Sequence, residues 1–235
     1  MGNRPGGELA QRPLQFVFIC DVSGSMTGKK IESLNFAIKE SIPEMRRVAD
    51  ENPNAAVQVR AITFSNGANW HVDQPTDVQQ FVWSDVSAFG VTDMGHAIDL
   101  VAEALDINKM PERGLPPVLI LISDGQPTDD FKSALDRLVR LPWGAKSVRV
   151  AIGIGDDADM DVLLQFMGGD GREVQPLKAN NAQDLVKFIK WASTVPLAAA
   201  SKPASLPEGD DSDAHIPLPP APQPSSDPID PGDVF

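Results

Sequence analysis

The chain has 235 residues, 42% of them hydrophobic, and a formal net charge of −13. This length allows one domain with a substantial core, and the negative charge argues against nucleic acid or an anionic membrane as the main partner. No apolar run reaches the roughly 18 residues of a membrane span, no secretory signal is visible, and the single cysteine excludes an intramolecular disulfide. We therefore expect a cytoplasmic protein.

The first predicted element is a buried strand that ends in oxygen-bearing side chains. It follows residues 1–13, a polar stretch with Gly and Pro that we expect to be flexible. Residues 16–20 (FVFIC) are all apolar, as in a parallel strand buried on both faces. Asp21, Ser23 and Ser25 come next, at alternate positions. Ligands bind at the carboxyl ends of strands in open α/β sheets, so these side chains are expected at a ligand-binding edge.

A helix and a hairpin are predicted next. Apolar residues recur at helical spacing over residues 31–48, and Pro43 should kink this helix or end it early. Residues 57–64 alternate as a half-exposed strand does. Asn66-Gly67 is a turn signal, and residues 70–72 predict an antiparallel partner strand.

Two further oxygen ligands stand at the ends of later elements. Thr92 lies in a loop before a helical pattern over residues 97–105, whose start Thr92 or Asp93 can cap. Residues 118–122 (VLILI) are a second buried-strand run, and Asp124 follows it directly after Ser123.

The remaining pattern completes an α/β fold. Helices are predicted over residues 131–139, 162–167 and 185–192, and strands over residues 147–152 and 173–177. Strands that alternate with helices indicate a doubly wound, mostly parallel sheet. The strands before Asp21 and Asp124 should then lie side by side at the switch point of this sheet, which brings the two carboxylates together.

These motifs resemble the von Willebrand factor A (vWA) domain and its metal-ion-dependent adhesion site (MIDAS): D-x-S-x-S, then a Thr, then an Asp before Gly. The resemblance covers residues 14–195 and implies a six-stranded Rossmann-like sheet with one antiparallel edge strand. S-G-S-M, S-D-G-Q-P-T-D-D and residues 152–159 are most similar to the TerY-type proteins of bacterial tellurium-resistance clusters.

The resemblance also assigns a metal site. It implies that the Ser23 and Ser25 hydroxyls bind the ion directly, that Thr92 joins in the ligand-bound state, and that Asp21 and Asp124 bind directly or through water. A divalent ion among neutral hydroxyls and few carboxylates stays electron-poor, so a partner's Asp or Glu readily completes it. Mg²⁺ suits this oxygen set best, and Mn²⁺ could replace it. The alternative, hydroxyls that only cap helices and turns, is disfavoured because both carboxylates follow matching strand ends.

We expect a non-enzymatic protein-binding module whose partner presents an acidic side chain. A TerY-like role would imply a PP2C-type phosphatase and a Ser/Thr kinase as partners in stress or defence signalling. TerY-type relatives often carry a zinc ribbon, yet no CxxC occurs here. The alternatives are an adaptor of a MoxR-type AAA+ ATPase and a metal-dependent phosphohydrolase. The second is disfavoured because Ser23 stands where that chemistry needs a second carboxylate.

Two further features bear on the site. Asp156, Asp157, Asp159 and Asp161 could form a second cation site, but helix capping is the favoured interpretation. Many vWA proteins have Gly-Gly-Thr where this chain has Gly90-Val91-Thr92. Because Val91 is stiff and disfavours positive φ, we expect the Thr92 loop to move less than in integrin-like relatives.

Residues 196–235 form a Pro-rich acidic tail. They hold ten of the 21 prolines, seven acidic residues and one lysine, with few large apolar side chains. Such a composition cannot offset the entropy of ordering, so we expect a disordered segment. It could dock on a partner, visit the chain's own metal site, or only keep the protein soluble.

Overall fold

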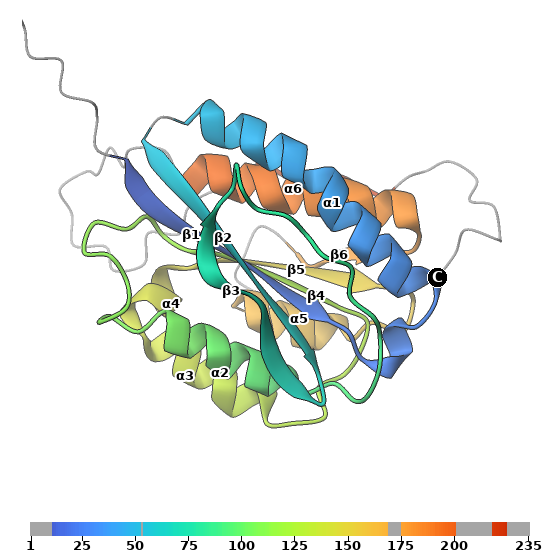
Figure 1. The fold of residues 1–235 in the computed structure, drawn as a ribbon. Coiled ribbons are helices and arrows are strands. Elements are labelled where there is room, and N and C mark those ends of the chain that lie inside the picture. The colour runs from blue at the N-terminus through green and yellow to red at the C-terminus, as the bar shows by residue number, and fades with distance from the viewer. Residues whose placement is uncertain (1–10, 53, 169–174, 201–217, 225–235) are drawn as a thin grey trace, which may run out of the picture.

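The computed structural model describes residues 11–52, 54–168, 175–200 and 218–224. In this part of the chain one sheet lies between two layers of helices (Figure 1). The strands are β1 (Arg12–Asp21), β2 (Ala55–Ser65), β3 (Gly67–Asp77), β4 (Val118–Ser123), β5 (Val148–Ile154) and β6 (Leu177–Ala179). The helices are the 3-10 turn η1 (Gly24–Met26), α1 (Lys29–Asp50), α2 (Met94–Ala104), α3 (Phe131–Arg140), α4 (Pro142–Lys146), α5 (Met160–Met167) and α6 (Ala182–Ala200).

The strand order β3-β2-β1-β4-β5-β6 confirms the predicted architecture. β3 pairs antiparallel with β2 at one edge, and the other neighbouring strands pair in parallel. The chain leaves β1 toward β2 on one side and returns to β4 on the other, so the switch point lies between β1 and β4. Ligands bind at such a point in doubly wound sheets.

β1 is apolar throughout because it contributes to two cores. Phe16, Phe18 and Cys20 belong to the cluster that also contains the buried residues of α1 and α6. Val17 and Ile19 point to the opposite face, where they pack with residues of α2, α3 and α5. Side chains of a strand alternate between the faces of a sheet, so a strand covered on both sides needs apolar residues at every position.

Some expected element boundaries are wrong. α1 does not end at Pro43; the helix continues to Asp50 because Pro43 lies on its exposed face, while Ile42 and Met45 on either side are buried. A carbonyl freed by the missing N–H can bond water there. The last strand lies at Leu177–Ala179, later than predicted, and residues 169–174 lie outside the described residues. The short helix α4 was not predicted.

The last helix of the domain extends beyond the predicted domain boundary. α6 runs to Ala200, past the boundary predicted at residue 195, and Leu197 is fully buried. Within the predicted tail, residues 218–224 contact the folded domain, since Leu218 and Ala221 pack against the α1–α6 core. The rest of the tail, residues 201–217 and 225–235, and residues 1–10 lie outside the described residues. Among the described helices none is both long and apolar enough to cross a membrane.

Candidate metal centre

The centre starts at the end of β1, where the chain makes a tight turn. The Ser23 backbone N–H donates to Asp21 Oδ1 over 2.8 Å, and the Met26 N–H donates to the Ser23 carbonyl over 3.0 Å. Met26 is completely buried and fixes the turn to the core. This turn brings Ser23 Oγ and Ser25 Oγ to 3.0 Å from each other.

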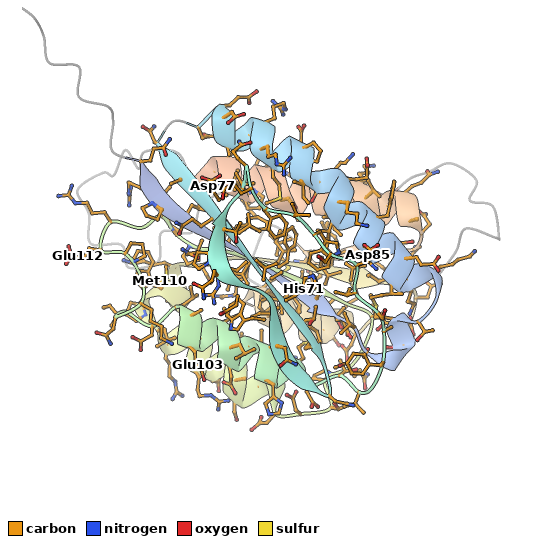
Figure 2. The ribbon with its side chains drawn as sticks, viewed as in Figure 1. His71, Asp77, Asp85, Glu103, Met110 and Glu112 are labelled. Carbon is orange, nitrogen blue, oxygen red and sulfur yellow. The ribbon has the colours of Figure 1, made fainter. Side chains whose placement is uncertain are left out.

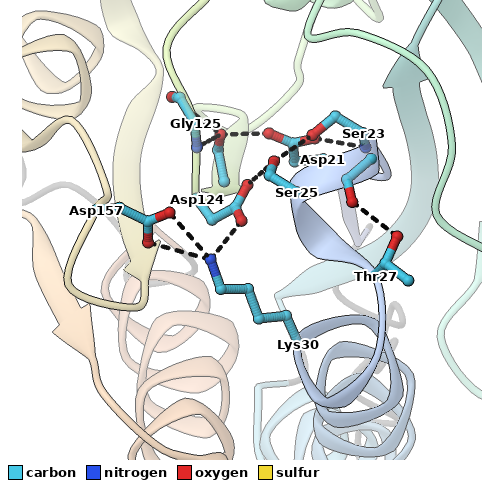
Figure 3. Close-up of polar contacts among 10 residues, drawn as sticks. Asp21, Ser23, Ser25, Thr27, Lys30, Asp124, Gly125 and Asp157 are labelled. Carbon is cyan, nitrogen blue, oxygen red and sulfur yellow. Dashed lines mark hydrogen bonds and ion pairs between the residues drawn. The ribbon is translucent and has the colours of Figure 1, made fainter. Parts of the chain in front are cut away.

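The end of β4 supplies the second carboxylate. Ser25 Oγ donates to Asp124 Oδ1 over 2.7 Å, which connects two residues 99 positions apart (Figure 3). Ser123, the last residue of β4, donates from its hydroxyl to Asp21 Oδ2 over 2.5 Å. Asp21 and Asp124 are both almost completely buried. Adjacency of β1 and β4 therefore brings the two aspartates into one hydrogen-bonded cluster, as the topology predicts.

Thr92 approaches the same cluster from a third segment. The position that a Cβ on Gly125 would take lies 3.5 Å from Thr92 Oγ1 and 3.8 Å from Ser25 Oγ. Both hydroxyls are thus close to the backbone that follows Asp124. Thr92 is buried although it belongs to a loop. The five predicted ligands, Asp21, Ser23, Ser25, Thr92 and Asp124, consequently gather at one edge of the sheet.

The loop that carries Thr92 is fixed to the loop after β4. The Thr92 N–H donates to Thr128 Oγ1 over 3.1 Å, and the Thr128 N–H donates to the Thr92 carbonyl over 2.9 Å. Asp129 accepts from the backbone N–H groups of Gly95 and His96 at the start of α2. Asp129 therefore caps a helix from outside it.

Neither residue predicted to cap α2 has that role. Asp93 stands at the N-cap position, yet its carboxylate accepts from the Gly67 N–H over 2.7 Å and from Thr128 Oγ1 over 2.9 Å instead. These two hydrogen bonds, the backbone one first, lower the pKa of Asp93. At the starts of α3 and α6, by contrast, the carboxylate of Asp130 accepts from the Ser133 N–H and the side-chain oxygen of Asn181 accepts from the Asp184 N–H.

Lys30 is a polar contact of the centre that the sequence analysis missed. Its Nζ lies 2.6 Å from Asp124 Oδ2 and 3.1 Å from Asp157 Oδ1 (Figure 3). Desolvation acts to lower the pKa of Lys30, but the hydrogen bonds and charges of the two aspartates outweigh it, and the pKa is raised. The position of Lys30 early in a helix that follows the D-x-S-x-S motif was the only available signal.

Asp21 has a different environment from Asp124. Burial raises its pKa, because desolvation disfavours the charged form more than the hydrogen bonds from Ser123 and Ser23 favour it, and the charge of Asp124 adds to the increase. A nearby divalent cation would favour the ionised form.

The gathered side chains fit a hard divalent cation. Every predicted ligand offers oxygen, and three of the five are neutral hydroxyls. Among the described residues, no group of three or more His, Cys, Asp or Glu side chains is placed so that it could hold a metal ion. Three of the four acidic residues at 156–161 have separate roles. Asp156 pairs with Lys178, Asp157 pairs with Lys30, and Asp159 caps α5 as predicted.

A cavity of about 290 Å³ lies elsewhere, between β3 and α2. Glu103 and Met110, labelled in Figure 2, belong to its lining. Inside it the Arg60 guanidinium lies 3.5 Å from the centre of the Trp70 ring and donates to the Asp73 carbonyl. No described residue of the candidate metal centre lines this cavity.

Comparison with known proteins identifies the fold and its relatives. The pig (Sus scrofa) inter-alpha-trypsin inhibitor heavy chain H2 is 26% identical over 198 residues. The match covers 77% of this chain and 20% of the relative, so the chain spans about a fifth of that relative's length.

Solved structures share the fold at lower identity. A von Willebrand factor type A protein from Catenulispora acidiphila has a TM-score of 0.58 at 16% identity, over 79% of this chain and 43% of that one. Proximal thread matrix protein 1 from the mussel byssus, with zinc in its MIDAS motif, has a TM-score of 0.54 at 18% identity, over 81% and 46%. Manganese-loaded TRAP protein from Plasmodium vivax has a TM-score of 0.54 at 18% identity, over 76% and 74%.

A family model for the von Willebrand factor type A domain matches residues 16–190, which span β1 to α6. The chain therefore belongs to the von Willebrand factor type A domain family.

Proposed function

We propose that this chain is a non-enzymatic protein-binding module that depends on a divalent cation, Mg²⁺ or alternatively Mn²⁺. The observation that carries the proposal is the gathering of five oxygen-bearing side chains from three separate segments at the switch point between β1 and β4. Zinc and manganese in the related mussel and Plasmodium proteins support a divalent cation.

The chain's own residues would hold the cation and leave room for a partner. Ser23, Ser25 and Thr92 would provide neutral hydroxyls, and Asp21 and Asp124 the negative charge. When bound, the cation would supply a Lewis-acidic position that a carboxylate of the partner can occupy. A metal and a carboxylate form a strong, charge-assisted anchor, so a partner with an exposed Asp or Glu is expected.

The finer assignment of partners follows from the TerY resemblance. We propose a PP2C-type phosphatase and a Ser/Thr kinase, with a MoxR-type AAA+ ATPase as the alternative. Direct binding of the purified domain to each candidate, with Mg²⁺ and then with EDTA, separates them. A TerY-like role requires the phosphatase or the kinase to bind only with Mg²⁺.

Variants of the proposed ligands test the metal site itself. Asp21→Ala, and separately the double variant Ser23→Ala/Ser25→Ala, should abolish Mg²⁺ binding in a calorimetric titration while the domain stays folded. The residues lie at a strand end and contribute little to either core. Arg137→Ala is a suitable control, because its salt bridge to Asp99 is exposed and away from the centre.

Two results would contradict the proposal. Unchanged Mg²⁺ affinity in Asp21→Ala would show that the site is assigned to the wrong residues. Mg²⁺-dependent turnover of a generic phosphatase substrate, lost in Asp21→Asn, would show a phosphohydrolase instead of a binding module.

A further inference from the structure

Lys30 lies at the base of the candidate metal centre. It is the second residue of α1, and its side chain extends toward the ends of β4 and β5 (Figure 3). Only 13% of this side chain is exposed, and the Asp124 side chain that it contacts is completely buried. The ammonium thus connects α1 with the segments that follow two strands, at the edge where the predicted ligands gather.

The position is unfavourable for a cation unless something compensates. The N-terminus of a helix carries partial positive charge, so a lysine in the first turn of α1 is repelled by the helix itself. Burial of the ammonium adds a desolvation cost. Two carboxylates, Asp124 at 2.6 Å and Asp157 at 3.1 Å, offset both effects.

The two oxygens of the Asp124 carboxylate have different partners. Oδ1 accepts from Ser25 Oγ over 2.7 Å, on the side of the hydroxyl ligands, whereas Oδ2 accepts from Lys30 Nζ over 2.6 Å. Because the ammonium already holds Oδ2, a cation that took both oxygens of Asp124 would have to share Oδ2 with Lys30.

We propose that Lys30 sets the balance between metal affinity and partner affinity at this site. The inference rests on the proposed function, since it assumes that a divalent cation binds there. Lys30 lowers metal affinity, because its charge repels a second cation and occupies one oxygen of Asp124. For the same reasons less negative charge from the protein reaches the cation, which leaves it better able to attract a carboxylate of the partner.

The experiment replaces Lys30 by Met, which keeps the length of the side chain and removes its charge. We expect Lys30→Met to bind Mn²⁺ more tightly by about tenfold in calorimetry, because one unit of positive charge close to the site is lost. Acetate serves as the minimal carboxylate probe. Acetate that binds the Mn²⁺-loaded protein should displace bound water, which water-proton relaxation measures. Lys30→Met should need a several times higher acetate concentration for the same displacement.

Two controls separate this effect from general changes in charge. Lys178→Met also removes a lysine that pairs with an aspartate of the same loop. Lys178 Nζ lies 2.9 Å from Asp156 Oδ1, and its side chain is more exposed than that of Lys30. Lys178→Met should leave both affinities unchanged. Lys30→Arg keeps the positive charge and should lie nearer to the wild type than to Lys30→Met in both measurements. Circular dichroism in EDTA verifies that each variant is folded.

Opposite changes in the two affinities are the signature of the proposal. Mn²⁺ affinity that falls or stays constant in Lys30→Met would overturn it, and so would unchanged acetate affinity. A fall in both would show that Lys30 only supports the structure of Asp124. Failure of the proposed function looks different, because Mn²⁺ would then bind the wild type and Ser23→Ala/Ser25→Ala equally, or bind neither.

Discussion

The two aspartates at the carboxyl edge of the sheet, Asp21 and Asp124, differ in their polar neighbours. Asp124 is paired with Lys30, while Asp21 accepts hydrogen bonds from Ser123 Oγ and the Ser23 N–H. Burial raises the pKa of Asp21, so its carboxylate is held in the fold at a cost that a bound cation would relieve. The proposed cation would therefore favour the ionised form of Asp21.

A cation that binds only the folded state should stabilise the protein. At a Mg²⁺ concentration about 100 times the dissociation constant, the free energy of unfolding should rise by about 2.7 kcal/mol. Urea unfolding with Mg²⁺ and with EDTA measures the difference. Ser23→Ala/Ser25→Ala is the matched variant in which Mg²⁺ should have no effect. A wild type equally stable in both conditions would argue against the metal site.

Thr92 should matter more for the partner than for the metal. Its backbone is held by Thr128 in both directions, so the loop can stay in place when the hydroxyl is removed. We expect Thr92→Ala to weaken binding of an acidic partner by about tenfold and to reduce Mg²⁺ affinity much less, because the vWA resemblance implies that this hydroxyl would join the cation mainly in the ligand-bound state. Thr92→Ser, which keeps the hydroxyl, is the control. Calorimetric titrations that show equal losses for metal and partner would contradict this role.

At the scale of elements, the loop before α2 is hydrogen-bonded to two neighbouring turns. Gly90 has a φ of 77°, its carbonyl accepts from the Gly24 N–H over 3.0 Å, and the next N–H, of Val91, donates to Asn66 Oδ1. A Cβ at Gly90 would lie 2.5 Å from Asn66 Oδ1, the same atom that accepts this bond. The loop is therefore tied both to the turn after β1 and to the β2–β3 turn. These ties support the expectation of a less mobile Thr92 loop.

Gly90→Ala and Gly67→Ala form a matched pair that tests this anchoring. Both glycines have positive φ, 77° and 75°, but a Cβ at Gly67 would meet nothing within 4 Å. Gly67→Ala should cost about 1 kcal/mol of unfolding free energy for the backbone conformation alone. Gly90→Ala should cost about 1 kcal/mol more, because Asn66 must move and lose its hydrogen bond. Urea unfolding of the two variants measures the difference. Equal losses of unfolding free energy would mean that the Asn66 contact contributes nothing to stability.

The sequence predicts the elements well where the signal is local, and it places the proposed ligands Asp21 and Asp124 just after predicted strands. Buried-strand runs place Asp21 and Asp124 at strand ends, and parallel pairing then puts the ends together. What sequence could not show depends on contacts made only in the fold. Asp129 caps α2 from a loop more than thirty residues away, and Lys30 reaches a carboxylate 94 residues away. The possible early end of the helix at Pro43 was wrong for a similar reason, since only packing shows that Pro43 lies on the solvent side of α1.

Across the whole molecule, the net charge of −13 is unevenly distributed, and part of the acidic, Pro-rich tail lies against the domain. Leu218 and Ala221 pack on the same core as α1 and α6, and Lys187 Nζ on α6 donates to the Gln223 carbonyl over 2.6 Å. A lysine that donates to a backbone carbonyl holds the chain independently of the side chain at that position. Residues 218–224 are thus attached by a few contacts instead of by a core of their own.

Deletions of different lengths test whether this attachment stabilises the domain. Removal of residues 201–235 should lower the free energy of unfolding by about 1–2 kcal/mol, because it exposes the apolar surface that Leu218 and Ala221 cover. Removal of residues 225–235 keeps these contacts and should change it by less than about 0.5 kcal/mol. Leu218→Ser in the full chain should reproduce part of the larger loss. The deletions must begin after Ala200, since Leu197 is completely buried in the core. If the two deletion variants are equally stable in urea, residues 218–224 lie on the domain without stabilising it. The role of the tail must then be sought in partner binding.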